Sequence, residues 1–145
     1  SFKFGAMKFK LFQNKGPLEH DWLLFMVRLA ASLFMMTHGF HKLEKLLTGG
    51  DIKFYDFLGM GPKISLVLCI VGEFVAPIFV ILGYQFRWAC YLVVFTMFVA
   101  AYGAHFGETF SEKEHSLIYF LLFLLIKQTG PGKFSLEYFL KSRKA

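Results

Sequence analysis

Long apolar stretches separated by short polar segments make up most of the chain. Three of them, residues 22–40, 64–84 and 88–106, are long enough to cross a bilayer as helices. About 20 residues at a rise of 1.5 Å span a hydrocarbon core of about 30 Å. The apolar residues are consecutive and do not alternate with polar ones, which excludes the pattern of a membrane β-barrel. The sequence therefore predicts three membrane helices over these ranges.

A fourth apolar stretch is shorter. Residues 116–126 carry no charge, but as a helix they would extend only about 17 Å. We therefore expect the helix to cover 112–128, with Lys127 reaching back to the interface along its alkyl chain. Glu114 and His115 are too short to do this and should point into the bundle. The prediction is one all-α domain, an integral membrane four-helix bundle over residues 1–145.

The distribution of basic residues predicts the orientation of this bundle. With four spans, one side carries both termini and ten Lys or Arg, the other carries five, and Arg28 within a span completes the 16 of the chain. The positive-inside rule then places both termini in the cytoplasm. We expect residues 1–6, which precede Met7, to be an added segment without a functional role.

The first external loop contains a helix pattern of its own. Asp51 is a suitable N-cap and Gly59 a suitable helix stop. Between them, Phe54, Phe57 and Leu58 would share one face of a helix. The pattern predicts a short interfacial helix over 51–59. This helix is compatible with a lid over the outer end of the bundle and equally with a simple membrane-surface anchor.

Composition supports a membrane protein and excludes several other classes. Hydrophobic residues make up 56% of the chain and charged residues 18%, which would leave a soluble domain of this size with too much apolar surface. The net charge of +6 is carried by residues that flank the apolar stretches, so we expect contact with membrane lipids and no nucleic-acid binding. Cys69 and Cys90 form no C-x-x-C, which argues against thiol redox chemistry and a cysteine zinc site.

Two ionisable residues lie at hydrocarbon depth in the predicted spans. Glu73 is about 14 Å from the external start of its helix, and Arg28 about 9 Å from the cytoplasmic start of the first helix. An unpaired charge at the helix centre costs about 2.5–3.5 kcal/mol or more. The spacing predicts an Arg28–Glu73 ion pair, which serves equally well as a structural latch or as part of a site.

Further ionisable residues gather near the predicted outer end of the bundle. The catalytic candidates are Glu73, His38 and His105, and the binding candidates are Arg28, Lys42, Glu114 and His115. A structural alternative is that His38 and His105 are helix-end residues bonded to interfacial water. We predict no metal site among these side chains.

The order of these polar residues resembles that of the DoxX-like membrane proteins over about residues 23–137. The motifs that carry the resemblance are, in order, Val27-Arg28-Leu29, His38-Gly39-Phe40-His41-Lys42, Gly72-Glu73-Phe74, Gly83-Tyr84-Gln85-Phe86-Arg87, His105, Glu114 and Pro131-Gly132-Lys133-Phe134-Ser135-Leu136-Glu137. Glu137 stands where that family often has aspartate, and His41 and His115 are less typical of it.

The resemblance implies a four-helix fold in the bacterial plasma (inner) membrane. Members are linked to quinone-coupled oxidation, including the membrane subunit of a thiosulfate:quinone oxidoreductase, and to membrane redox complexes. The first hypothesis is therefore a component of a quinone-linked oxidoreductase, with a quinone as its substrate or ligand. His38 or His105 would donate to a quinone carbonyl, Glu73 or Glu114 would supply a proton, and Arg28 would set the charge state of Glu73.

Other functions remain open, and the sequence leaves undecided whether the protein is an enzyme. No motif for flavin, haem or iron–sulfur is present, so electrons would come from a redox partner protein or directly from substrate. A noncatalytic membrane anchor or assembly partner of a redox enzyme is the alternative. A small-solute or lipid transporter ranks third, because Glu73 beside a Pro77 kink resembles a broken-helix site. Small residues in Gly72-x-x-x-Ala76 and Gly103-x-x-x-Gly107 suit close helix packing and a possible homo-oligomer.

Overall fold

The computed structural model describes residues 17–144, and within this range the chain is helical with no strand. The segment 1–6 lies outside the described residues. The elements in order are α2 (Pro17–Thr48), the 3-10 turn η1 (Phe57–Gly59), α3 (Pro62–Ile70), the π turn η2 (Val71–Val75), α4 (Ala76–Leu82), α5 (Phe86–Val99), the π turn η3 (Ala100–Ala104), α6 (Phe110–Thr129) and α7 (Leu136–Ser142).

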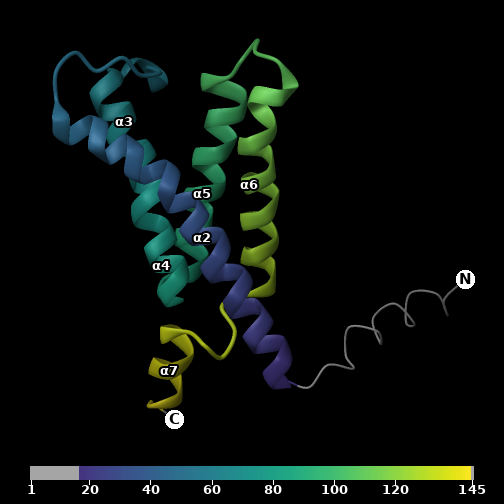
Figure 1. Cartoon of the computed structure of the whole chain (residues 1–145). Helices are drawn as coiled ribbons and strands as arrows, with labels where there is room; N and C mark the ends of the chain where they lie inside the picture. Colours follow the sequence, from purple (N-terminus) through teal and green to yellow (C-terminus); the bar gives the residue numbers. More distant parts are fainter. Residues whose placement is uncertain (1–16, 145) are drawn as a thin grey trace, which may run out of the picture.

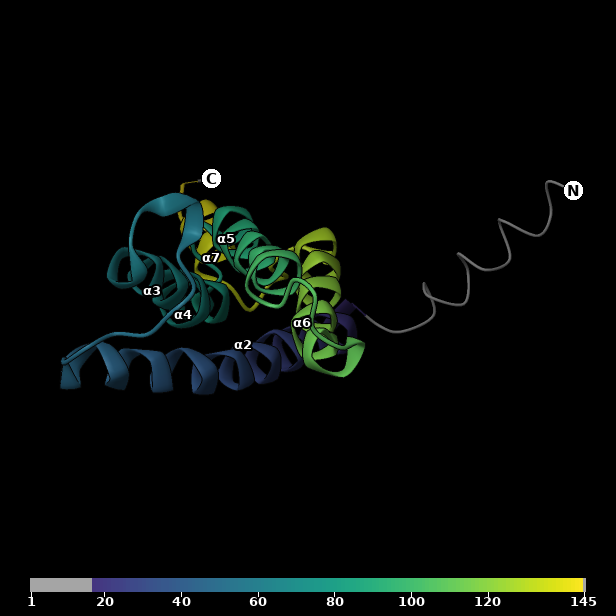
Figure 2. The ribbon, with the colours of Figure 1, turned by 90° about the horizontal axis from the view of Figure 1, so that it is seen from above.

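These elements form four rods and one short terminal helix. Helices α3 and α4 join through η2 into one rod, and α5 continues through η3 into a second that runs beside α6 (Figure 1). Helix α2 crosses the other helices at a slant (Figure 1) and lies along one side of them in the view from above (Figure 2). Helix α7 lies at the end of the bundle where α2 begins and α4 ends (Figure 1).

Among the residues that the structure describes, three helical segments are long and apolar enough to cross a membrane: His20–Thr48, Pro62–Leu82 and Phe86–Ala104. The first contains the predicted span 22–40 and continues eight residues beyond Phe40, whereas the second and third each begin and end two residues before the predicted spans 64–84 and 88–106. Helix α6 has 20 residues, but Glu112, Lys113 and Glu114 lower the hydropathy of its first turns. The protein is therefore an integral membrane protein by these three helices, while the fourth span and the cytoplasmic termini stay predictions.

The predicted interfacial helix over 51–59 was wrong. Residues 52–56 form no regular element, and only the turn η1 follows them. Gly49 and Gly50 adopt positive φ values of 73° and 89°, which end the helical path after α2. Beyond them a side chain replaces a backbone carbonyl as hydrogen-bond acceptor: Phe57 N donates to Ser65 Oγ at 2.8 Å. We call residues 49–61 the outer loop.

The kink predicted near Pro77 takes the form of a π turn. Proline has no N–H, so Pro77 cannot make the usual helical bond to the carbonyl of Glu73. The turn before it widens, and Ala76 N bonds to the carbonyl of Val71, five residues back. Such turns are rare and often occur at functional sites. Here the turn carries Glu73, which is buried with 3% of its surface exposed.

Small residues allow the helices around this turn to touch. A Cβ atom on Gly39 of α2 would lie 2.7 Å from the backbone carbon and oxygen of Glu73. A Cβ atom on Gly72 would clash with Thr96 Oγ1 of α5. The small face of Gly72 is therefore used within the chain, where it brings η2 against α5.

The core lies between α2, α4, α5 and α6. Its buried side chains include Met35, Val80, Phe86, Val93 and Phe123, each exposed by 1% or less. Large apolar side chains on the outward faces are instead exposed, among them Phe34, Trp88, Phe95 and Leu125. An aqueous protein would avoid such a surface, whereas hydrocarbon solvates it.

Candidate functional site

Arg28 does not pair with Glu73, which corrects the predicted ion pair. Arg28 is only 1% exposed, and its guanidinium donates to the backbone carbonyls of Ile81 at 3.1 Å, of Pro131 and of Phe134. The segment after α6 folds back under the bundle and supplies two of these carbonyls. The charge of Arg28 is therefore solvated by backbone dipoles at the end of the bundle opposite the outer loop.

Further bonds fasten the same C-terminal segment. Glu137 N donates to Gly83 O at 3.0 Å, and Glu137 Oε1 accepts from Phe86 N at 2.9 Å. Lys133 N donates to Asp21 Oδ1 at 3.2 Å. Together with the bonds of Arg28, these contacts hold α2 to the segment before α7, in place of the predicted latch between Arg28 and Glu73. We call this set the C-terminal clamp.

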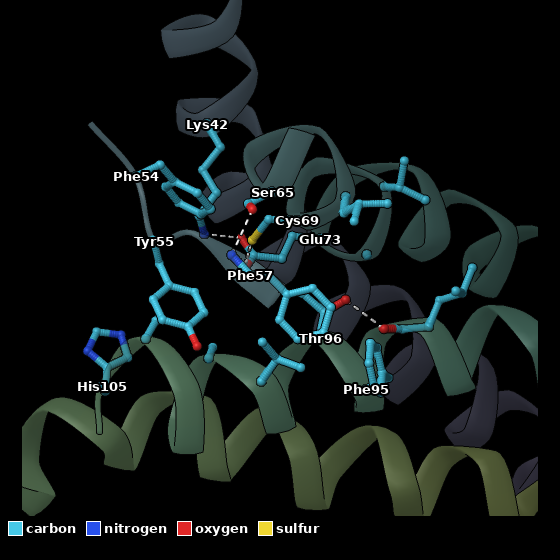
Figure 3. A pocket seen from close by; sticks show the side chains of 17 residues that line it. Lys42, Phe54, Tyr55, Phe57, Ser65, Cys69, Glu73, Phe95, Thr96 and His105 are labelled. Carbon is cyan, nitrogen blue, oxygen red and sulfur yellow. Dashed lines mark hydrogen bonds and ion pairs between the residues drawn. The ribbon is translucent and has the colours of Figure 1, made fainter. Parts of the chain in front are cut away.

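The partner of Glu73 is Lys42, in an ion pair that joins η2 to α2 (Figure 3). Lys42 lies in α2 because the helix continues to Thr48, one turn beyond His38 on the same face. Glu73 Oε2 meets the Lys42 ammonium, and Glu73 Oε1 accepts a hydrogen bond from Cys69 Sγ at 3.2 Å. Both carboxylate oxygens are thus satisfied although the side chain is buried.

One side of this pair faces a mostly apolar cavity of about 240 Å³ (Figure 3). We call it the apolar cavity. Its walls come from α2, the outer loop, the α3–η2 rod and the α5–η3 rod. It is lined by Lys42, Phe54, Tyr55, Phe57, Ser65, Leu68, Cys69, Val71, Gly72, Glu73, Leu92, Phe95, Thr96, Val99, Ala100, Ala104 and His105.

The rim of the apolar cavity lies on the outward surface of the bundle. Leu68 of α3 and Leu92 and Phe95 of α5 line the cavity and are also 46%, 46% and 57% exposed. The cavity therefore opens sideways between α3 and α5, towards the surface that lipid would cover. The outer loop closes it at the end of the bundle, where Tyr55 lies against Gly103, with its hydroxyl 2.9 Å from where a Cβ atom would stand.

A second cavity of about 160 Å³ lies on the other side of the ion pair. We call it the polar cavity. It is lined by Met35, His38, Lys42, Glu73, Met97, Ala100, His105, Glu112, His115, Ser116 and Tyr119. His38 Nε2 and His115 Nε2 are 2.8 Å apart and form a hydrogen bond between α2 and α6. The ring of Tyr119 packs on both imidazoles.

Four residues line both cavities: Lys42, Glu73, Ala100 and His105. Glu73 comes from η2 and Ala100 from η3, so each π turn contributes to the shared wall. His105 follows η3 directly, and its Nδ1 atom contacts Glu108. The Lys42–Glu73 pair therefore stands between an apolar space open to the side and a polar space at the outer end.

The structure brings five of the seven predicted site residues together: Glu73, Lys42, His38, His105 and His115. Arg28 belongs to the C-terminal clamp, and Glu114 is exposed on α6. Glu112 takes the place expected for Glu114, because α6 begins at Phe110 and a capping box with Thr109 fixes its first turn.

Several residues of the site escaped the sequence reasoning. Glu112 had a usable signal, since its spacing of three from His115 places both on one helix face. Tyr55 and Cys69 had none, because their places depend on the fold of the outer loop and on the helix rotation. Within residues 17–144, no group of three or more His, Cys, Asp or Glu side chains is arranged to hold a metal ion.

Comparison with known proteins places the chain in a family. No curated protein and no solved structure matches it. The DoxX family model matches residues 23–106, which is 84 (106 − 23 + 1) of the 145 residues and more than half of the chain. The match includes the four residues shared by the two cavities, while α6, α7 and the resemblance over 107–137 lie beyond it. The chain therefore belongs to the DoxX family of membrane proteins.

Proposed function

We propose that this protein is the quinone-binding membrane component of an oxidoreductase in the bacterial plasma membrane. The observation that carries the proposal is the apolar cavity, which opens sideways between α3 and α5 and ends at a partly buried ion pair. A quinone is a lipid-soluble molecule with a flat, polar head. It would reach such a site from the hydrocarbon phase without crossing water.

The size of the cavity suits a quinone head whose tail stays outside. Its volume of about 240 Å³ is below the range of about 300–1,000 Å³ usual for sites that enclose a whole drug-sized ligand. The side chains of Phe54, Phe57 and Phe95 offer ring faces or edges to a flat conjugated head. An isoprenoid tail would leave past Leu68 and Leu92 into lipid.

Hydrogen-bond donors for the quinone carbonyls line the same space. Tyr55 carries a hydroxyl, Lys42 an ammonium and His105 an imidazole. Quinone reduction consumes two electrons and two protons, and Glu73 is the buried acid–base group at the cavity wall. The electrons would come from a redox partner protein that carries flavin, haem or iron–sulfur cofactors.

Cys69 provides a direct test, because its thiol lines the apolar cavity beside Glu73. The full chain in lipid nanodiscs is treated with N-ethylmaleimide, with and without decylubiquinone, and alkylation of each cysteine is followed by mass spectrometry. We expect the quinone to slow alkylation of Cys69 and to leave Cys90, which is buried away from the cavity, unchanged. Decane at the same concentration is the matched control, since it lacks the polar head.

Equal alkylation of Cys69 with quinone and with decane would refute a specific quinone site. A second measurement is independent of the thiol: an isoprenoid quinone identified by mass spectrometry in extracts of the purified protein supports the proposal. Its absence, together with unprotected Cys69, counts decisively against it.

The alternative, a noncatalytic anchor, is supported by the C-terminal clamp. Arg28 fixes the segment before α7. Helix α7 itself exposes the side chains of Tyr138, Phe139 and Leu140, which are available to a partner. Glu73→Gln separates the two functions. Under the quinone proposal it leaves a folded protein, less stable by the loss of the ion pair, and abolishes quinone-linked turnover in the assembled complex. Under the anchor alternative, turnover of the complex survives the substitution.

A further inference from the structure

The quinone head proposed above occupies the apolar cavity, whereas the lining of the polar cavity suits water. At about 30 Å³ per molecule in the liquid, its volume of about 160 Å³ corresponds to roughly five waters. Imidazole, carboxylate, ammonium and hydroxyl groups on α2 and α6 provide the two to four polar partners that a buried water requires.

The hydrogen bond between His38 and His115 requires the two rings to share a proton. An Nε2–Nε2 bond needs an N–H on one ring and a lone pair on the other. At 2.8 Å, His38 and His115 therefore hold one proton between them. Histidine takes up and releases protons near neutral pH, and each ring keeps a second nitrogen, Nδ1, outside this bond. The pair can accept a proton at one end and release one at the other.

The pair is placed next to the wall that separates the two cavities. Lys42 lies one helical turn beyond His38 and contacts Glu73, whose carboxylate faces both spaces. The ionisable groups that face the histidine pair across the cavity are Lys42 of α2, Glu73 of η2, His105 after η3, and Glu112 and Tyr119 of α6. His41, beside His38 in sequence, is exposed and does not line the cavity.

On the basis of the quinone-linked function above, we propose that the polar cavity is a hydrated proton-transfer site. The His38–His115 pair relays protons to Glu73, and Glu73 passes them to the quinone in the apolar cavity. The reduced partner protein gives up two electrons in total, and the two quinone carbonyl oxygens become hydroxyl groups. Each of the two protons leaves the carboxyl group of Glu73, which is reprotonated from the polar cavity before the next transfer.

Proton uptake by the bound quinone tests this relay. The full chain in nanodiscs is loaded with decylubiquinone, reduced by two flashes with photogenerated deazaflavin radical, and followed by quinone absorbance and a pH-indicating dye. In His38→Gln and in His115→Gln we expect proton uptake to slow about 10²-fold, a typical contribution of a positioned acid–base group. Quinone affinity should stay at the wild-type value. His41→Gln is the matched control and should keep the wild-type rate.

Rescue distinguishes a relay from a structural role. His115 is exposed, so His115→Ala should fold, and added imidazole should restore most of its lost rate. Wild-type uptake rates in both glutamine variants, or a slow His115→Ala protein that imidazole leaves slow, would overturn the relay while the quinone site stands. If the wild-type protein binds no quinone, the proposed function fails, and the relay with it.

Discussion

Gly39→Ala tests the close contact on which the position of Glu73 depends. The new Cβ atom would lie 2.7 Å from the backbone carbon and oxygen of Glu73 and 2.8 Å from Cβ of Phe74. Ordinary contact begins at 3.4 Å, so α2 and η2 must separate by about 0.7 Å (3.4 − 2.7). The opposing atoms belong mainly to the backbone, and no side-chain rotation can relieve them.

The expected change in stability follows from two opposing terms. Overpacking of this kind costs about 1–3 kcal/mol, whereas replacing glycine by alanine inside a helix gains up to about 1 kcal/mol. The free energy of unfolding should therefore fall by roughly 1–2 kcal/mol, because backbone atoms yield less readily than side chains. The same shift moves Glu73 away from Lys42, so protection of Cys69 by decylubiquinone should weaken as well.

Thermal unfolding in nanodiscs, followed by tryptophan fluorescence, measures the first effect, and maleimide labelling measures the second. Thr37→Ala is the matched control, since Thr37 lies on the same helix and is exposed. A Gly39→Ala protein that melts at or above the wild-type temperature, with unchanged quinone protection, would refute the contact between α2 and η2.

Three further substitutions test the clamp, the ion pair and the outer loop. In Arg28→Lys the ammonium cannot reach all three carbonyls, and each unsatisfied buried group costs about 1–3 kcal/mol. The substitution should therefore lower the free energy of unfolding by at least about 2 kcal/mol and speed tryptic cleavage at Lys133. Arg87→Lys, at an exposed site, is the control and should change neither. Lys42→Met leaves Glu73 unpaired and should lower the free energy of unfolding by about 1–3 kcal/mol. This is less than the roughly 3–5 kcal/mol for a fully buried pair, because Lys42 is 28% exposed. Adding Glu73→Gln to Lys42→Met should recover most of the lost stability, and additive losses would contradict the pairing. Ser65→Ala removes the acceptor of Phe57 N and should speed amide exchange in the outer loop by tenfold or more, with α6 unchanged as the internal reference.

Helix positions were predictable from the sequence, but the partners of buried charges were not. Counting residues places a side chain along the membrane normal to within about a turn. It gives neither the direction in which the side chain points nor the other segments that reach the same depth. Arg28 is the clearest case, because two of its partners are backbone carbonyls more than 100 residues away, at separations of 103 and 106. Backbone acceptors leave no residue-type signal in a sequence.

The pairing of Lys42 with Glu73 depends on where the first helix ends. The first span was expected to end at Phe40, so that Lys42 would share the face of His38 only if the helix continued past that residue. The helix continues to Thr48, which keeps Lys42 on the face of His38 and directs it to Glu73. The loop after it was predicted as a helix from Asp51 and Gly59, but the glycines at 49 and 50 and the Ser65 hydroxyl favoured an irregular path.

The close packing around the π turn η2 explains how one carboxylate can line two cavities. Glu73 lies where three helices meet: Gly39 brings α2 against its backbone, and Gly72 brings α5 against the same turn. With its backbone held on both sides, Glu73 is the fixed member of the ion pair. Lys42 is partly exposed and has a long, flexible stem, so it is the member that can move. A ligand that draws Lys42 into the apolar cavity would therefore uncover Glu73 to the polar cavity, and this is the exchange that coupled electron and proton delivery requires.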